Sequence, residues 1–133
     1  GENSHVIPAL LKRIHQSKIN KDPYVKVWGD GTPKREFMYA DDCAKIICKI
    51  LFNNRYFKLI NIGTGQDITI KNLAQTICKI VGYNGKIRFE KKMPNGVQQK
   101  TLDISKIKKL KLNKFSDLEK TLKKTYEDFL TRI

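Results

Sequence analysis

The chain lacks several features that would assign it at once to a class of protein. Its three cysteines, Cys43, Cys48 and Cys78, have no Cys-x-x-Cys spacing and no clustered histidines, so neither a metal site nor a redox pair is indicated. No stretch approaches the roughly 20 uninterrupted apolar residues of a membrane span, and no signal peptide opens the sequence. These absences favour buried, reduced thiols in a cytoplasmic protein.

Acidic residues are scarce: 13 Asp and Glu stand against 27 Lys and Arg, which gives a formal net charge of +14. Such a balance raises the alternative of a basic nucleic-acid-binding module. The cations are mostly lysines spread along every segment, however, and no lysine-rich stretch combines arginine with aromatic side chains as base readers do. We therefore interpret the charge as solvated surface and expect neither nucleic acid nor membrane as a partner.

Two motifs of redox enzymes are also missing. No Gly-x-x-Gly-x-x-Gly follows a strand-like run, so the chain carries no dinucleotide-binding unit. None of the five tyrosines has a lysine four residues later, so there is no Tyr-x-x-x-Lys pair. At 133 residues, the chain is long enough for one domain or for part of a larger one.

Helical and strand-like patterns alternate along the chain, which predicts the α/β class. The expected strands are residues 24–28, 35–39, 57–62 and 86–90. The first expected helix is capped by Ser4 and ends near Ser17 to Asn20, and the second is capped by Asp41 or Asp42. The third runs from Thr69 to a stop at Gly82. A short helix is expected over 103–110, and a capping box at 116–119 opens the last one. Residues 91–100 are expected to form a polar loop.

Apolar residues recur at helical spacing in the longer helices. The stripe of the second helix comprises Ala44, Ile47, Ile50 and Leu51. The inward face of the third comprises Leu73, Ala74, Ile77 and Val81, and that of the last comprises Leu118, Leu122, Tyr126 and Phe129.

Residues 27–42 form the most informative stretch, which reads Val-Trp-Gly-Asp-Gly-Thr-Pro-Lys-Arg-Glu-Phe-Met-Tyr-Ala-Asp-Asp. A strand-like run ends at Trp28, and the Gly, Asp and Pro cluster after it requires a turn. A second extended run follows at Arg35. An arginine on a strand beside a glycine-rich turn, near an exposed tryptophan, suits a planar ligand that carries phosphate.

This stretch resembles the GxGxxxRxFxxVxD segment of the nucleotide-sugar epimerases, dehydratases and reductases of the extended short-chain dehydrogenase family. The flanking runs that extend the resemblance are residues 3–13, 61–65, 69–82 and 94–96. Because several motifs occur in the right order, the resemblance is more specific than any lone glycine pattern. It covers nearly the whole chain and is weakest in the last thirty residues.

The resemblance implies that residues 1–133 form a single substrate-binding domain, the C-terminal part of a longer Rossmann-type enzyme whose N-terminal Rossmann domain is absent here. Such an enzyme would epimerise GDP-4-keto-6-deoxy-D-mannose at C3 and C5 and reduce C4 with NADPH, which the missing domain would mainly bind. The parent would be a homodimer in the cytoplasm. The fragment alone is expected to be inactive.

The resemblance also assigns roles to individual side chains. His5 would be the catalytic general acid of epimerisation and would contact the cofactor. Substrate contacts would come from Arg13, Trp28, Arg35, Asn95 and Lys100. His15 has no such support and is expected at the surface, and the Gly63-Thr64-Gly65 segment is expected to be a structural turn.

The loop near Asn95 departs from the family pattern Pro-Asp-Gly-x-x-Arg-Lys. Asn95 replaces the carboxylate and Gln99 replaces the arginine, which leaves substrate geometry at this corner open. The nearest alternative is an enzyme for another nucleotide sugar, such as a GDP-mannose or UDP-hexose epimerase. The run from Ser4 to Pro8 favours the first interpretation.

Overall fold

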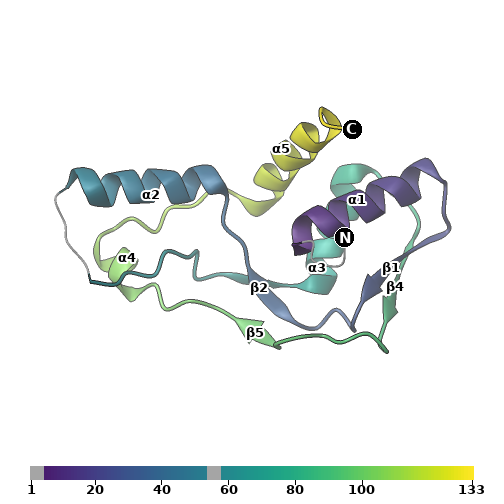
Figure 1. The fold of residues 1–133 in the computed structure, drawn as a ribbon, viewed down its shortest axis with the longest axis horizontal. Coiled ribbons are helices and arrows are strands. Elements are labelled where there is room, and N and C mark those ends of the chain that lie inside the picture. Colours follow the sequence, from purple (N-terminus) through teal and green to yellow (C-terminus); the bar gives the residue numbers. More distant parts are fainter. Residues whose placement is uncertain (1–4, 54–57) are drawn as a thin grey trace.

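The computed structural model describes residues 5–53 and 58–133. Ser4 and Phe57, the predicted first cap and the predicted start of a strand, lie outside the described residues. The described elements are α1 (Val6–Ile19), β1 (Tyr24–Trp28), β2 (Lys34–Glu36), α2 (Ala40–Phe52), β3 (Asp67–Thr69), α3 (Ile70–Val81), β4 (Lys86–Glu90), β5 (Gln99–Lys100), α4 (Ser105–Lys109) and α5 (Leu118–Leu130) (Figure 1).

The strands form two small sheets. In the first, β1 and β4 pair in parallel, and in the second β2 lies between β3, which is antiparallel to it, and β5, which is parallel. Helices and short strands alternate as predicted, which confirms the α/β class. β2 is shorter than the expected run to Tyr39, and β5 lies within the stretch that we expected to be wholly loop.

The main hydrophobic core joins α1, α3, α5 and β1 (Figure 1). Its fully buried members include Leu11, Ile14, Val25, Leu73 and Ile77. The predicted inward face of α3 is confirmed: Leu73, Ala74, Ile77 and Val81 are all buried.

Local signals placed the two ends of α3 correctly. The Thr69 hydroxyl accepts a hydrogen bond from the Asn72 backbone N–H at 3.1 Å, as a cap should. Gly82 ends the helix with a φ of 72°, a left-handed conformation that glycine adopts without the cost of a Cβ.

The predicted caps of α2 and α5 were wrong in detail. Tyr39, not an aspartate, occupies the N-cap of α2. Asp41 and Asp42 lie within its first turn, where the helix dipole favours negative charge. In α5 the cap is Asp117, whose carboxylate accepts a hydrogen bond from the Lys120 backbone N–H at 2.9 Å, and Ser116 lies outside the helix.

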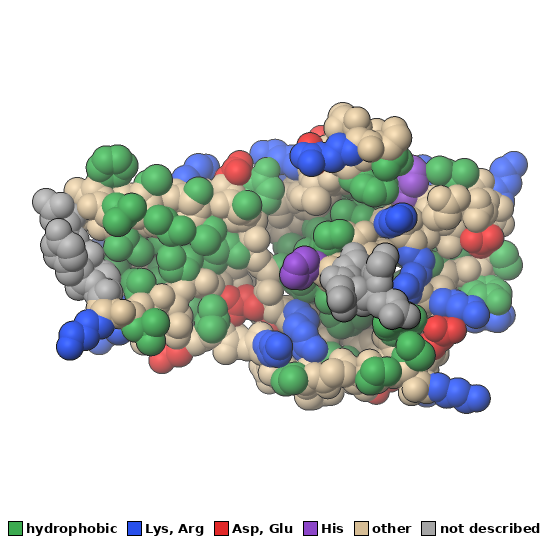
Figure 2. Space-filling model, viewed as in Figure 1, with side chains coloured by type: hydrophobic (Ala, Val, Ile, Leu, Met, Phe, Trp, Pro, Cys, Tyr) green, Lys and Arg blue, Asp and Glu red, His purple; other side chains and the backbone are tan. Residues whose placement is uncertain are grey.

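The apolar stripe of α2 faces outward. Ile47, Leu51 and Phe52 are 43%, 68% and 86% exposed, and the buried residues of the helix are Asp42 and Ile46. Figure 2 shows hydrophobic side chains gathered on the surface between α2 and the region around α4. This end of the molecule lacks a covering element among the described residues.

The expected strand at 57–62 is wrong for its described part, residues 58–62, which are irregular. Leu59 is 71% exposed. Strand formation requires a neighbour that supplies N–H and C=O partners, and no described strand pairs with this segment. Residues 58–62 therefore have the composition of a strand but no neighbouring strand to pair with among the described residues.

His15 was expected at the surface, but it is half-buried between α1 and α5. Its Nδ1 shares a hydrogen bond of 2.9 Å with the Tyr126 hydroxyl, and its ring meets the Tyr126 and Phe129 rings edge-on. Burial raises the pKa of the Tyr126 hydroxyl. The histidine therefore helps to fasten the last helix to the first.

The three thiols differ in exposure. Cys78 is buried, Cys43 is half-buried and Cys48 is exposed, so the expectation that all three are buried is confirmed for Cys78 alone. Burial raises the pKa of the Cys78 thiol to about 11, because a thiolate is costly to form away from water.

Candidate functional site

The glycine-rich turn between β1 and β2 is held in one conformation by its own residues. Gly29 and Gly31 have φ values of 81° and 80°, which side chains with a Cβ rarely adopt. The Asp30 carboxylate accepts hydrogen bonds from the Thr32 backbone N–H at 2.9 Å and the Thr32 hydroxyl at 2.7 Å. These Thr32 bonds are the main reason that the pKa of Asp30 is lowered.

The turn is also bound to the start of α3. The Lys71 backbone N–H donates to the Gly31 carbonyl, and the Ile70 backbone N–H donates to the Pro33 carbonyl, each at 2.9 Å. A Cβ at Gly31 would collide with the Phe89 ring. These contacts hold the turn in place. Trp28 directly precedes the turn and Arg35 follows it, so the turn fixes the positions of both residues.

Arg35 lies on the central strand of the second sheet, opposite Ile68 of β3 and Lys100 of β5. Register partners project from the same face of a sheet, so the two cations are neighbours. One guanidinium nitrogen of Arg35 donates to the Lys34 carbonyl at 2.7 Å. Among the described residues, no carboxylate forms an ion pair with Arg35 or Lys100.

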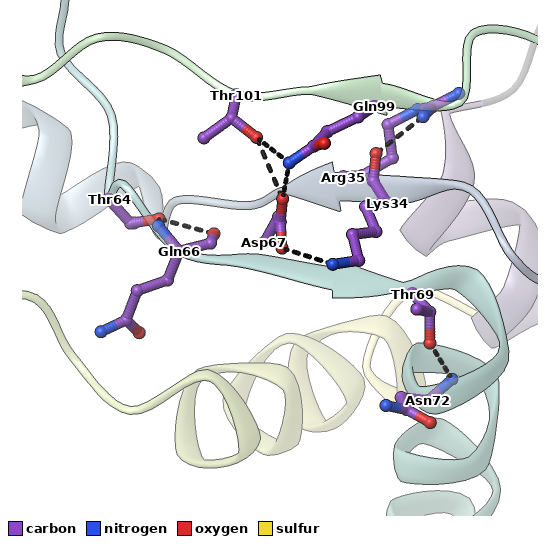
Figure 3. A network of polar contacts seen from close by, with 9 residues as sticks. All are labelled: Lys34, Arg35, Thr64, Gln66, Asp67, Thr69, Asn72, Gln99 and Thr101. Atoms are coloured by element: carbon purple, nitrogen blue, oxygen red, sulfur yellow. Dashed lines mark hydrogen bonds and ion pairs between the residues drawn. The ribbon is translucent and has the colours of Figure 1, made fainter.

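On the opposite face of the same sheet, the positive charge of Lys34 is neutralised by Asp67. Asp67 lies 3.9 Å from Lys34 and accepts hydrogen bonds from Gln99 at 2.6 Å and Thr101 at 3.1 Å. Figure 3 shows this cluster, with Arg35 extending away from it. Gln99 therefore supports the sheet on the face away from Arg35.

A groove of about 230 Å³ gathers four of the residues singled out from the sequence, Arg13, Trp28, Arg35 and Asn95. Its other walls are apolar and come from α1, β1, α3 and the loop before β5: Val6, Ala9, Leu10, Val27, Ile70 and Pro94. The sequence did not identify these apolar residues as part of a site. An apolar side chain that lines a groove recurs along the chain at the same spacing as one that is buried in the core.

Arg13 and Trp28 form one wall together. The guanidinium carbon of Arg13 lies 5.6 Å from the centre of the Trp28 ring, within cation–π range. Its Nη1 donates to the Lys26 carbonyl at 3.0 Å. Trp28 remains 45% exposed, so an indole face is available beside a fixed positive charge.

The other two singled-out residues are not among those that line the groove. His5 is the N-cap of α1 and directly precedes Val6, which lines it. Lys100 borders a separate hollow with Gly63 and Leu102, although its register partner Arg35 lines the groove. The structure thus brings four of the six candidates together in one groove, and it does not place His5 or Lys100 among the residues that line it.

Gly63-Thr64-Gly65 packs against β2. Glu36 accepts a hydrogen bond from the Thr64 backbone N–H at 2.8 Å, and a Cβ at Gly63 would collide with the Glu36 carboxylate. A larger hollow, about 740 Å³, lies between the start of α2 and the loop before α5. It contains none of the candidate residues.

The described residues offer neither a metal centre nor a membrane-spanning helix. In the part of the chain that the structure describes, no group of three His, Cys, Asp or Glu side chains could hold a metal ion. None of the helices over residues 5–53 and 58–133 combines the length and apolar character that a bilayer crossing requires.

The chain is similar to known proteins along most of its length. Residues 1–63 match the model of the NAD dependent epimerase/dehydratase family. The chain is 43% identical to GDP-L-fucose synthase of Escherichia coli K12, over 96% of this chain and 43% of that protein. It is 38% identical to putative GDP-L-fucose synthase 2 of Arabidopsis thaliana, over 99% and 40% respectively.

Residues 1–63 are therefore similar to the NAD dependent epimerase/dehydratase family. The chain spans well under half the length of these two relatives.

Solved structures show the same partial match. A GDP-L-fucose synthetase from Naegleria fowleri superimposes with a TM-score of 0.86 at 28% identity, over 98% of this chain and 40% of that one. The GDP-mannoheptose C4 reductase from Campylobacter jejuni, with NADP bound, gives 0.82 at 30% identity, over 96% and 45%. The fold is therefore part of the Rossmann-like fold of these enzymes, and the related enzymes use a nicotinamide cofactor.

Proposed function

We propose that this chain is the substrate-binding part of a GDP-L-fucose synthase. The parent enzyme would epimerise GDP-4-keto-6-deoxy-D-mannose at C3 and C5 and reduce C4 with NADPH, giving GDP-L-fucose. The observation that carries the proposal is the groove that gathers Arg13, Trp28, Arg35 and Asn95 from separate elements. The similarity to named GDP-L-fucose synthases supports it.

The diphosphate is proposed to bind at Arg35, with Lys100 beside it. Their positive charges lie on one face of the sheet without ion-pair partners among the described residues. A guanidinium binds two phosphate oxygens through parallel hydrogen bonds, and an ammonium adds a point charge. Two adjacent cations would attract a group with two negative charges.

Trp28 and Arg13 would form the wall against which the nucleotide sugar lies. An exposed indole face offers apolar contact to a planar base or to the C–H face of a sugar. Arg13, held by the Lys26 carbonyl, would keep its charge directed at the ligand. Asn95 closes the groove on the side of the turn.

His5 is proposed as the general acid of epimerisation and as a cofactor contact. Epimerisation removes a proton next to the ketone and returns one on the other face, and this return needs a positioned donor. The place of His5 at the entrance of α1, next to the groove residue Val6, suits that role.

NADPH would be bound mainly by the part of the parent that this chain lacks. The outward stripe of α2 and the irregular segment 58–62 are proposed to pack against that part, which would explain why so much apolar surface is exposed here. The parent is further proposed to be a homodimer in the cytoplasm.

The test is the activity of the full-length parent. With GDP-4-keto-6-deoxy-D-mannose and NADPH, we expect NADPH oxidation and a product that co-migrates with GDP-L-fucose. The relatives include a GDP-L-colitose synthase from Yersinia pseudotuberculosis at 38% identity, so a GDP-4-keto-dideoxy sugar is the informative competitor. Preference for that sugar, or for a UDP-hexose, would overturn the proposal.

A further inference from the structure

A second hollow, of about 550 Å³, shares Arg13 and Trp28 with the groove. These two side chains therefore border both spaces. The charged residues that line the hollow beyond them are Asp22, Lys26 and Glu90. Arg35, the proposed diphosphate ligand, lines the groove and not the hollow, so the hollow is open to another part of the nucleotide sugar.

Lys26, Trp28 and Glu90 project from one face of the sheet that β1 and β4 form. Val25 and Val27 are buried on the other face, because side chains alternate along a strand. Trp28 and Glu90 are register partners, which makes them neighbours across the two strands. The Lys26 ammonium lies 3.4 Å from one Glu90 carboxylate oxygen, and the two side chains are 58% and 34% exposed. A donor and an acceptor thus lie together beside the indole, where a ligand can reach both.

Arg13 is held at the border between the two spaces. Its Nη1 donates to the Lys26 carbonyl at 3.0 Å, and its guanidinium carbon lies 5.6 Å from the centre of the Trp28 ring. Nucleobases stack on indole rings and on the planes of guanidinium groups. The border is therefore built of two groups that suit a flat aromatic base.

The course of the groove brings the base end of the ligand to this border. Val6, which follows the proposed acid His5, and Arg13 both line the groove from α1. Seven residues of an α-helix rise roughly 10 Å. A nucleoside diphosphate sugar carries its sugar and its base on opposite sides of the diphosphate. With the sugar near His5 and the diphosphate at Arg35, the base comes to Arg13, where the second hollow begins.

We propose that this hollow receives the guanine base of the GDP-sugar, and that Lys26 and Glu90 recognise its edge. This inference rests on the proposed function. Guanine presents the acceptor O6 beside two donors, N1–H and the 2-amino group. The Lys26 ammonium donates to O6, and the Glu90 carboxylate accepts from N1–H and from the 2-amino group.

The same pair of side chains discriminates against other purines. Adenine carries an amino donor in place of O6 and an acceptor in place of N1–H, so Lys26 would meet a donor and Glu90 an acceptor. Hypoxanthine keeps O6 and N1–H and lacks only the 2-amino group. IDP therefore isolates the contact between that amino group and Glu90.

The experiment measures the affinities of GDP and IDP for the full-length parent by calorimetry, in the wild type, Glu90→Gln and Asp22→Asn. We expect the wild type to bind GDP about ten- to a hundredfold more tightly than IDP, which corresponds to one charged hydrogen bond. This GDP-to-IDP ratio should fall by about tenfold in Glu90→Gln, because a neutral amide offers a single uncharged acceptor. Asp22→Asn is the matched control, since Asp22 carries the other carboxylate of the hollow, and its ratio should equal that of the wild type.

The ratio reports base recognition separately from folding, because the binding stoichiometry gives the folded fraction of each variant. An unchanged ratio in Glu90→Gln would overturn the inference. An equal loss of the ratio in Asp22→Asn would also overturn it, because the effect would then belong to the charge of the hollow and not to Glu90.

The substrate assay distinguishes this inference from the proposed function. If the parent reduces a different GDP-sugar and the ratio still falls in Glu90→Gln, the proposed function fails and the recognition of guanine stands. If the parent makes GDP-L-fucose and the ratio is unchanged in Glu90→Gln, only the recognition of guanine fails. A parent that binds UDP more tightly than GDP would overturn both.

Discussion

The carboxylate of Asp42 on α2 accepts two hydrogen bonds from Ser116, 74 positions later. The backbone N–H of Ser116 lies 2.7 Å away and its hydroxyl 2.8 Å away. Asp42 is buried, with 7% of its surface exposed. The contact ties the start of α2 to the loop that opens α5, so two distant parts of the chain depend on one side chain.

Replacing Asp42 by alanine should therefore destabilise the fold. The Ser116 backbone N–H would lose its buried acceptor, which costs about 1–3 kcal/mol. Urea unfolding followed by circular dichroism measures the change. Asp41→Ala is the matched control, because Asp41 is the exposed neighbour in the same first turn, and equal losses in the two variants would contradict the role of the Ser116 contact.

Arg35→Lys in the full-length parent should weaken GDP-sugar binding although the charge is kept. A lysine cannot offer the two parallel donors of a guanidinium, and one charged hydrogen bond is worth roughly 1.5–3 kcal/mol. Calorimetry with GDP should show a dissociation constant about ten- to a hundredfold higher, with NADPH affinity unchanged. Lys34→Arg is the control, since Lys34 lies on the opposite face of the sheet with Asp67. Unchanged GDP binding in Arg35→Lys would show that Arg35 does not bind the diphosphate.

His5→Gln should impair epimerisation in the parent. Loss of a positioned proton donor typically costs 10²–10⁴-fold, and the measurement is solvent deuterium incorporation at C3 and C5 of the sugar. His15→Gln serves as the control, because His15 is held by Tyr126 between two helices. That variant should lower stability and leave exchange intact, whereas unchanged exchange in His5→Gln would exclude His5 as the acid.

The 133-residue chain by itself should not oxidise NADPH with the 4-keto sugar nucleotide, because it carries no dinucleotide-binding motif. It should also bind a hydrophobic dye, since Leu51 and Phe52 are 68% and 86% exposed. Leu51→Glu should reduce dye binding in the isolated chain and should destabilise the full-length parent. A parent that tolerates this variant would contradict the docking role proposed for α2.

The thiols should differ in reactivity. The thiolate is the reacting form, and the pKa of buried Cys78 is raised to about 11 while Cys48 is exposed. Iodoacetamide at pH 8 should therefore label Cys48 well before Cys78, as peptide mass mapping would show. Equal labelling of the two would indicate that the core around α3 opens readily.

The raised pKa of Cys78 also predicts a loss of stability in alkali. The unfolded chain releases the thiol proton near the usual value of 9.0 and the folded chain near 11, so folding is favoured by the protonated form. This contribution is complete below pH 9 and decreases as the pH rises toward 11. Cys78→Ala should show a flatter dependence of unfolding free energy on pH over this interval.

The sequence by itself determined those features that depend on near neighbours in the chain. The cap at Thr69 and the stop at Gly82 follow from hydrogen bonds and φ angles within a few residues. The turn after Trp28 follows from its glycines. The motif around Arg35 indicated the family, because residue types at fixed spacing are visible without a structure.

Only the tertiary structure decided which faces are covered and which polar groups meet. The stripe of α2 and the run at 58–62 have core-like composition, but burial needs an opposing element that the described residues do not provide. Gln99 meets Asp67, His15 meets Tyr126, and Asn95 meets Asp30 across 32, 111 and 65 positions. Such pairs depend on how sheets and helices come together, since spacing along the chain carries no signal for contacts this distant.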